Sequence, residues 1–349
     1  MRSLMVIILL FFSPAAYAAQ DIAADQSAAR ILAYFRVGQD DFPQANVTLE
    51  QFKEHLAALK AQGAHVLPLD KVIQAFEDEM PLPPKTVVIT FDGNDKSVVT
   101  VAAPLLEEHN YPFTVFLVPS RIEAQSSHQL TWADVKALKK SPLASLGLQA
   151  PFPSKNEETI RAYYNNATAR LRDHNIDKIK FLSFLEGRYD QQLLTISKRY
   201  GFTAMVGQNS GVAYKSGPDD VLPRYVMTED FADPNRFTMI MQSLPLPVKD
   251  LTPTLSVLND ALPSIGFTLN DDLLEQKDQL SCFAAGQEKP ALQWLGARVE
   301  IRLASPIADP RFRVNCTIAL KDERNPETLY WRWLGLLMTR NEPLLEAQN

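Results

Sequence analysis

Apolar runs and amphipathic segments alternate along the chain from residue 31 to about residue 210. The run at 86–91, Thr-Val-Val-Ile-Thr-Phe, is the strongest signal for a buried strand. The capping box Thr48-Leu-Glu-Gln51 opens a segment of helical spacing that stops at Gly63. Continuous apolar strands separated by helices predict a parallel sheet that is covered on both faces or closed into a barrel.

The same periodicity predicts further strands and helices in strict alternation. The predicted strands are 31–35, 66–69, 86–91, 113–118, 143–148, 179–185 and 202–206. The predicted helices follow Thr48 and span 71–78, 96–109, 131–140, 155–172 and 191–200. In such folds the active site lies beyond the carboxyl ends of the strands.

The pattern changes after about residue 245. Pro245-Leu-Pro247 is typical of a linker, and the segments at 299–303, 312–318 and 330–333 alternate with period two or read as strands. We therefore expect an α/β domain over 19–245, followed by a small antiparallel β sandwich over 246–349. Trp331 and Trp333 share one strand face and are interpreted as sandwich core, with stacking on a sugar ring as the alternative.

The first residues resemble a targeting segment. Arg2 precedes a nine-residue apolar stretch and an Ala-x-Ala site that ends at Ala18. This predicts a signal peptide over 1–18 and a periplasmic or secreted protein, with an uncleaved anchor as the alternative. The run is shorter than the roughly 20 residues that span a bilayer, so no transmembrane segment is expected after cleavage.

Composition narrows the class of partner. The 349 residues are 46% hydrophobic and 22% charged, which is typical of a globular chain. A net charge of −6 supplies no basic face for phosphates, so nucleic acid is not expected as a partner. Export would allow the two cysteines, Cys282 and Cys316, to form one disulfide, and two buried free thiols remain the alternative.

Several motifs together resemble one enzyme family. Strand 86–91 runs into Thr-Phe-Asp92-Gly-Asn-Asp95, and Tyr34-Phe-Arg-Val-Gly38 and Leu130-Thr-Trp132 stand at matching positions. Over roughly 30–230 the chain resembles the polysaccharide deacetylases with NodB homology, carbohydrate esterase family four. The resemblance implies a distorted (β/α)7 barrel of NodB type and N-acetylated polysaccharide as the partner.

The family's chemistry uses a metal, a base and an acid. By resemblance, two successive Asp residues supply the base and one ligand, two His four residues apart supply the other ligands, and a late His is the acid. Here Asp92 matches the base, but Gly93 follows it, and Gln149 and Pro153 stand at the His positions. The last His is His174, so no late His can act as the acid.

These losses favour a metal-free, catalytically impaired relative that retains a groove for envelope or extracellular polysaccharide, with no cofactor expected. We expect Asp92 at the base position and Asp95, Gln149, Arg188, Tyr189, Gln208 and Arg224 in the substrate cleft. Asp95 can alternatively cap the helix that follows it. Zinc or another divalent metal enters only under the alternative, an active N-deacetylase (a hydrolase of C–N bonds) with a displaced site around Asp92, Asp95 and Glu186. A third possibility is an interaction protein whose sandwich binds a protein partner of unknown identity.

Overall fold

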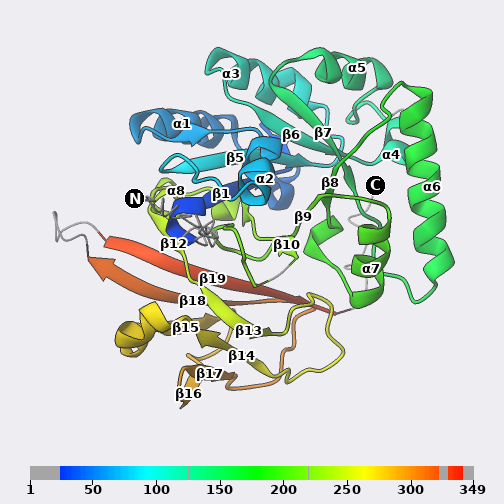
Figure 1. Ribbon diagram of the computed structural model, residues 1–349. Helices are drawn as coiled ribbons and strands as arrows, with labels where there is room; N and C mark the ends of the chain where they lie inside the picture. The colour runs from blue at the N-terminus through cyan, green and yellow to red at the C-terminus, as the bar shows by residue number, and fades with distance from the viewer. Residues whose placement is uncertain (1–23, 125, 219, 322–328, 341–349) are drawn as a thin grey trace, which may run out of the picture.

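The computed structural model describes residues 24–340 except 125, 219 and 322–328 (Figure 1). The predicted signal peptide lies outside the described residues. None of the helices within this described part is both long and apolar enough to cross a membrane.

The first part of the chain is a barrel of parallel strands surrounded by helices (Figure 1). The strand order is β10-β9-β8-β7-β6-β5-β1-β11. These strands are β1 (Ala29–Tyr34), β5 (Thr86–Asp92), β6 (Phe113–Leu117), β7 (Ala144–Gln149), β8 (Phe181–Ser183), β9 (Ala204–Val206), β10 (Val221–Leu222) and β11 (Tyr225–Val226). The short strand β4 (His65–Val66) adds to the start of β5.

One short segment closes the barrel. Its first half, β10, pairs with β9, and its second half, β11, pairs with β1. β10 and β11 are consecutive in the chain, so together they complete the ring. The other six strands of the ring are β1, β5, β6, β7, β8 and β9. The predicted seven-unit barrel is confirmed, although the closing segment was not predicted.

The side chains of the strands alternate between the barrel interior and the surrounding helices. Inward residues such as Ile31, Val88 and Phe116 form one buried cluster with Leu69 and Val72 of α2 (Leu69–Glu77). The opposite faces of the strands pack in a larger cluster against the other helices. Helix α2 therefore fills the amino-terminal end of the barrel, and the carboxyl end remains as the place for a site.

The helices agree closely with the periodicity. They are α1 (Leu49–Ala61), α3 (Ala103–Glu108), α4 (Pro119–Glu123), α5 (Trp132–Lys140), α6 (Glu157–Asp173), α7 (Gln191–Arg199) and α8 (Pro234–Met241). The capping box forms, because Thr48 Oγ1 accepts from the Gln51 amide and the Gln51 side chain accepts from the Thr48 amide. The helix predicted over 96–109 instead begins as a π-helical stretch, Val98–Ala102. Pro104, which lacks an N–H, cannot bond back to Thr100, so the regular helical pattern is interrupted there.

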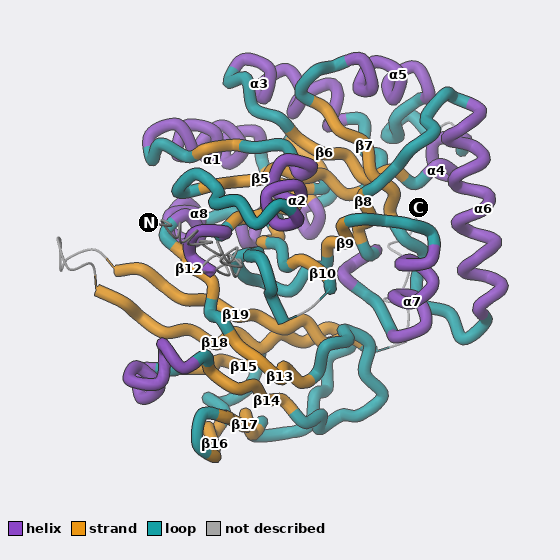
Figure 2. Tube along the Cα trace, in the orientation of Figure 1, coloured by secondary structure: helices purple, strands orange, loops and turns teal. Residues whose placement is uncertain are grey.

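The C-terminal region contains two four-stranded sheets, in the orders β12-β19-β18-β15 and β13-β14-β17-β16 (Figure 2). Their bounds are β12 (Ser243–Pro245), β13 (Val248–Thr252), β14 (Ile265–Leu269), β15 (Ser281–Ala284), β16 (Ala291–Leu295), β17 (Arg298–Arg302), β18 (Arg311–Lys321) and β19 (Leu329–Thr339). The predicted sandwich is present, but β12 runs parallel to β19, so the sheets are not purely antiparallel. β12 begins at Ser243, before the predicted domain boundary at 245. The position of that boundary stays a prediction.

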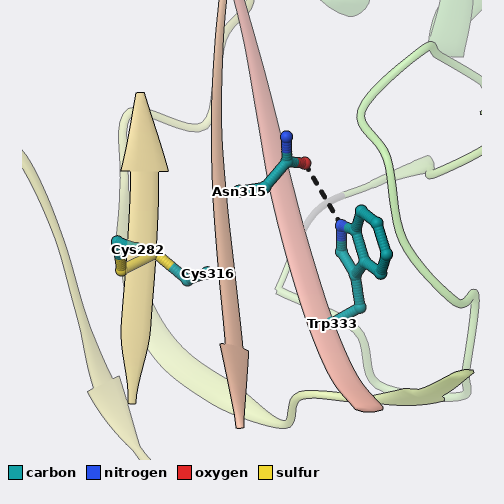
Figure 3. The surroundings of a disulfide bond; sticks show 4 residues. All are labelled: Cys282, Asn315, Cys316 and Trp333. Atoms are coloured by element: carbon teal, nitrogen blue, oxygen red, sulfur yellow. Dashed lines mark hydrogen bonds between the residues drawn. A yellow bond between two sulfur atoms is a disulfide. The ribbon is translucent and has the colours of Figure 1, made fainter. Parts of the chain in front are cut away.

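The predicted disulfide between Cys282 and Cys316 is confirmed (Figure 3). The two residues lie directly opposite each other on β15 and β18, with Cα atoms 4.1 Å apart. The bond joins the edge strand of this sheet to its long central hairpin.

The sheet with β18 and β19 lies between the barrel and the outer sheet. Leu336 and Met338 of β19 belong to the sandwich core, whereas Trp333, on the opposite face, packs against the barrel core. Its ring meets Tyr225 edge to face at 5.7 Å, and its Nε1 donates to Asn315 Oδ1 (Figure 3). The interpretation of Trp333 as sandwich core is therefore wrong, because a strand between two layers buries both of its faces.

His55 of α1 couples the stability of the barrel to pH. It is buried, its Nε2 donates to the Ala232 carbonyl at 3.0 Å, and its Nδ1 accepts from the Tyr34 hydroxyl at 2.9 Å. The carbonyl can only accept, so the neutral ring with its proton on Nε2 satisfies both bonds. Burial lowers the pKa of His55 to about 4.

A folded-state pKa below the unfolded value predicts that stability is lost as the pH falls from about 6.5 toward 4. The loss attributable to His55 is about 3 kcal/mol of unfolding free energy. Urea unfolding of wild type and His55→Gln at pH 7 and pH 4 measures it, with the exposed His65→Gln as the matched control. An identical pH dependence in His55→Gln and wild type would contradict this assignment.

Candidate functional site

Asp92, which the resemblance predicts at the base position, forms an ion pair with a buried arginine. Asp92 ends β5, and Arg224 lies between β10 and β11, in the segment that closes the barrel. Arg224 Nη1 and Nη2 donate to the two Asp92 carboxylate oxygens, each at 2.7 Å. The side chains are 0% and 1% exposed. A charge-assisted, bidentate pair of this kind uses both oxygens of the carboxylate.

Other groups inside the barrel complete the environment of Arg224. Its Nε donates to the Gly207 carbonyl at 2.7 Å, and Nη1 also donates to Thr90 Oγ1 at 3.1 Å. The guanidinium carbon lies 5.6 Å from the centre of the Phe116 ring. A Cβ at Gly147 would lie 2.4 Å from that ring, so the glycine makes room for it. Phe116 and Arg224 therefore fill the interior next to Asp92.

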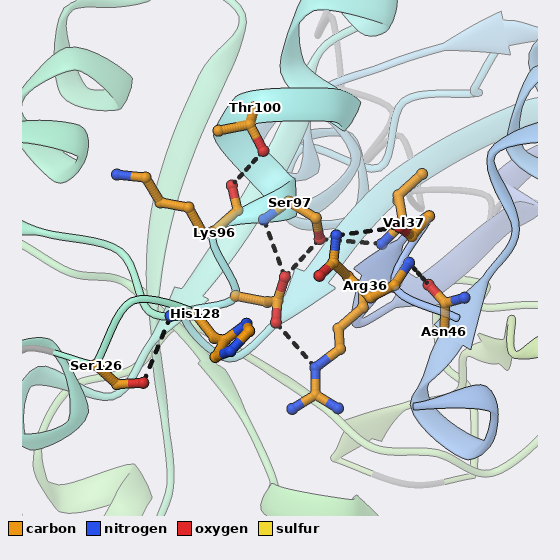
Figure 4. Close-up of polar contacts among 11 residues, drawn as sticks. Arg36, Val37, Asn46, Lys96, Ser97, Thr100, Ser126 and His128 are labelled. Carbon is orange, nitrogen blue, oxygen red and sulfur yellow. Dashed lines mark hydrogen bonds and ion pairs between the residues drawn. The ribbon is translucent and has the colours of Figure 1, made fainter. Parts of the chain in front are cut away.

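Asp95 lies in the same loop but has different partners (Figure 4). Arg36 Nε donates to Asp95 Oδ2 at 2.9 Å, and the Ser97 amide and hydroxyl donate to Oδ1 at 2.9 and 2.6 Å. The Asn94 side chain holds the loop to β6 by bonding to both the amide and the carbonyl of Val118. The two carboxylates are thus committed to two different arginines.

The donor set does not fit a catalytic zinc ion, which needs three His, Asp, Glu or Cys ligands and one open position. Gln149 is buried at the end of β7, and Gly93 and Pro153 carry no side-chain donor atom. Within the described ranges, no three His, Cys, Asp or Glu side chains are grouped so as to hold a metal. No chemical step through a metal can be derived from these residues.

The remaining predicted cleft residues are buried next to the C-terminal region. Gln208 follows β9, and its side-chain oxygen accepts from Arg311 Nη2 at 2.5 Å. The Tyr189 amide donates to Ser256 Oγ at 2.7 Å, and Arg188 pairs with Glu186 at 3.2 Å. Exposures of 3%, 1% and 2% for Gln208, Tyr189 and Arg188 differ from the expected open cleft. Contact of these residues with a substrate stays a prediction.

Two further arginines, which were not predicted from the sequence, connect the C-terminal region to these loops. Arg311 and Arg313 lie on the barrel-facing side of β18 and bond to the carbonyls of Glu186 and Gln208 at 2.6 and 2.7 Å. Burial lowers the pKa of Arg311 to about 10 and that of Arg313 to about 9. The period-two pattern at 312–318 indicates that one face of this strand is apolar and the opposite face, which carries Arg313, is polar. A polar strand face is normally solvated, however, so the pattern alone gave no reason to place it on the barrel.

Comparison with known proteins gives a family match. A sequence model of the family described as polysaccharide deacetylase matches residues 79–205. A poly-beta-1,6-N-acetyl-D-glucosamine N-deacetylase of Staphylococcus epidermidis is 30% identical over 101 residues, which are 29% of this chain and 35% of the relative. The enzyme of the same name from Staphylococcus aureus strain N315 is 23% identical over 172 residues, 48% of this chain and 58% of the relative. The chain thus spans between about a third and three fifths of these curated relatives.

Solved structures match the fold of the barrel. The Streptococcus pyogenes deacetylase PplD in complex with acetate has a TM-score of 0.55 at 20% identity, covering 61% of this chain and 98% of that one. IcaB from Ammonifex degensii has a TM-score of 0.56 at 19% identity, covering 62% of this chain and 97% of that one. At these identities the likeness shows the fold alone.

The buried pair predicts strong energetic coupling between Asp92 and Arg224. Arg224→Met leaves the carboxylate buried without a partner and should cost about 3–5 kcal/mol of unfolding free energy. Asp92→Leu should cost a similar amount, because it leaves the guanidinium unpaired. The double variant removes both charges and should be markedly more stable than the sum of the single losses implies. Additive losses in urea unfolding of the three variants would show that the two side chains do not depend on each other.

Proposed function

We propose that this chain, whose residues 79–205 belong to the polysaccharide deacetylase family, binds N-acetylated polysaccharide outside the cytoplasm without deacetylating it by metal catalysis. The observation that carries the proposal is the ion pair between Asp92 and Arg224, at a barrel mouth where the described residues form no group of three metal-ligating side chains. The names of the relatives favour a polymer of β-1,6-linked N-acetylglucosamine as the ligand.

The chemistry of deacetylation explains why this pair matters. A general base must accept a proton from water, and its pKa and free lone pairs decide whether it can. Both carboxylate oxygens of Asp92 accept hydrogen bonds from Arg224, a permanent cation that cannot lose its proton. A water molecule would have to displace a bidentate ion pair at a buried position, which is energetically costly. Asp92 is therefore better suited to hold the barrel closed than to activate water.

The alternative, an active deacetylase with a displaced metal site, finds less support. Such a site requires Asp92, Asp95 and Glu186 to turn toward one ion, whereas each of them pairs with a different arginine: Arg224, Arg36 and Arg188. Oxygen ligands alone would also favour a weakly held hard cation over zinc.

Export is part of the proposal. The Arg2-containing leader with its Ala-x-Ala site supports it. The disulfide between Cys282 and Cys316 supports it independently, since such bonds persist mainly in oxidising compartments.

Purified protein loaded with zinc or cobalt tests the proposal when it is incubated with β-1,6-linked N-acetylglucosamine oligomers. We expect retention of the protein in gels that contain the polymer and no metal-dependent release of acetate. An active family member assayed in parallel controls for the substrate and metal. Turnover that a chelator abolishes would contradict the metal-free assignment, and absence of retention would contradict polysaccharide binding.

A further inference from the structure

The rim of the barrel mouth that the C-terminal sheet leaves uncovered carries an exposed aromatic ring backed by a fixed cation. Phe42, in the loop after β1, is 38% exposed. The guanidinium of Arg36 lies 4.0 Å from the centre of its ring, and the His128 ring lies 6.3 Å away at an interplanar angle of 73°. These three residues, here called the rim cluster, lie beyond the carboxyl ends of β1 and β6: Arg36 begins the short strand β2 (Arg36–Val37), and Phe42 and His128 lie in loops.

Hydrogen bonds hold Arg36 and the loop of His128 in place (Figure 4). The Val37 amide donates to Ser97 Oγ at 3.1 Å, and that hydroxyl donates in turn to Asp95. Asp95 then fixes Arg36 through Nε. The Lys96 amide donates to the His128 carbonyl at 2.8 Å, which ties the third loop to the same turn. Arg36 and the loop of His128 are thus preorganised, so a ligand would lose little free energy in ordering them.

Arg36 retains donors that point away from Asp95. Its two terminal nitrogens make no hydrogen bond to the residues that the structure describes, and its side chain is 25% exposed. Figure 4 shows these nitrogens directed away from the carboxylate. Four N–H groups are consequently available to acceptors on a bound molecule.

We propose that the rim cluster binds one N-acetylhexosamine unit of a polysaccharide. The C–H face of a pyranose matches the exposed part of the Phe42 ring, and hydroxyl and acetamido oxygens match the donors of Arg36 and His128. Three carboxylates accompany the one arginine of the rim cluster. Asp40 and Asp41 precede Phe42 in the sequence, and Asp95 pairs with Arg36. This excess of carboxylates disfavours an anionic polymer and favours a neutral or partly deacetylated one.

This inference rests on the proposed function but locates the site away from Asp92. The position is chemically reasonable, because the interior next to Asp92 is filled and the loops after β8 and β9 face β18. A polymer that runs along the open rim would contact Phe42 without entering the barrel.

Binding of a β-1,6-linked N-acetylglucosamine pentamer, measured by isothermal titration calorimetry on the full chain, tests the rim cluster. Phe42→Ala should raise the Kd about tenfold, the equivalent of about 1.4 kcal/mol. Phe42→Trp should preserve or improve binding, because it keeps a stacking surface. Arg36→Lys keeps the charge but loses the planar donors and should also weaken binding severalfold.

Phe283→Ala is the matched control. This residue is 55% exposed and lies under a cation, Lys289, at 6.0 Å, but it belongs to β15 of the C-terminal region. We expect wild-type affinity from it, and unchanged melting temperatures should show that all variants are folded. Wild-type affinity in Phe42→Ala would overturn the rim cluster while leaving polysaccharide binding intact. No binding by the wild-type chain would instead overturn the proposed function.

Discussion

The buried ion pair between Arg224 and Asp92 organises the mouth of the barrel, because removing either charge would leave the other buried without a charged partner. Arg224 stands in the segment that joins β10 to β11 and thereby closes the ring. Its only carboxylate partner in the described interior is Asp92, so the segment that closes the ring also supplies the cation that holds Asp92.

The C-terminal sheet has a related effect at the other side of the mouth. Arg311 and Arg313 reach from β18 to the loops after β8 and β9, and Trp333 of β19 packs against the barrel core. Buried arginines that bond to carbonyls are satisfied donors, and they make the covering sheet part of the barrel's own packing. The proposed polysaccharide site therefore lies on the other side of the mouth, at the segments that follow β1 and β6.

Local sequence patterns predicted most strands and helices of the barrel, but they did not predict the side-chain contacts at its mouth. The run at 86–91 and the capping box at Thr48 are short-range signals, and both elements formed where the periodicity placed them. The residue types also show directly that Gly93 and Pro153 carry no side-chain donor atom. The partner of Asp92 was not, because Arg224 is 132 residues away in sequence and only closure of the barrel brings it there. The burial of Gln208 depended likewise on a strand about 100 residues later.

Arg224 binds both carboxylate oxygens of Asp92 and holds them in a buried ion pair that a metal ion would have to disrupt. Anomalous diffraction from crystals soaked in a zinc salt tests this pair, because a catalytic zinc ion would lie about 2.0–2.2 Å from a carboxylate ligand. We predict no zinc peak within ~3 Å of Asp92 and an Arg224 guanidinium still bound to both carboxylate oxygens. A zinc peak at Asp92 with Arg224 displaced would contradict this account.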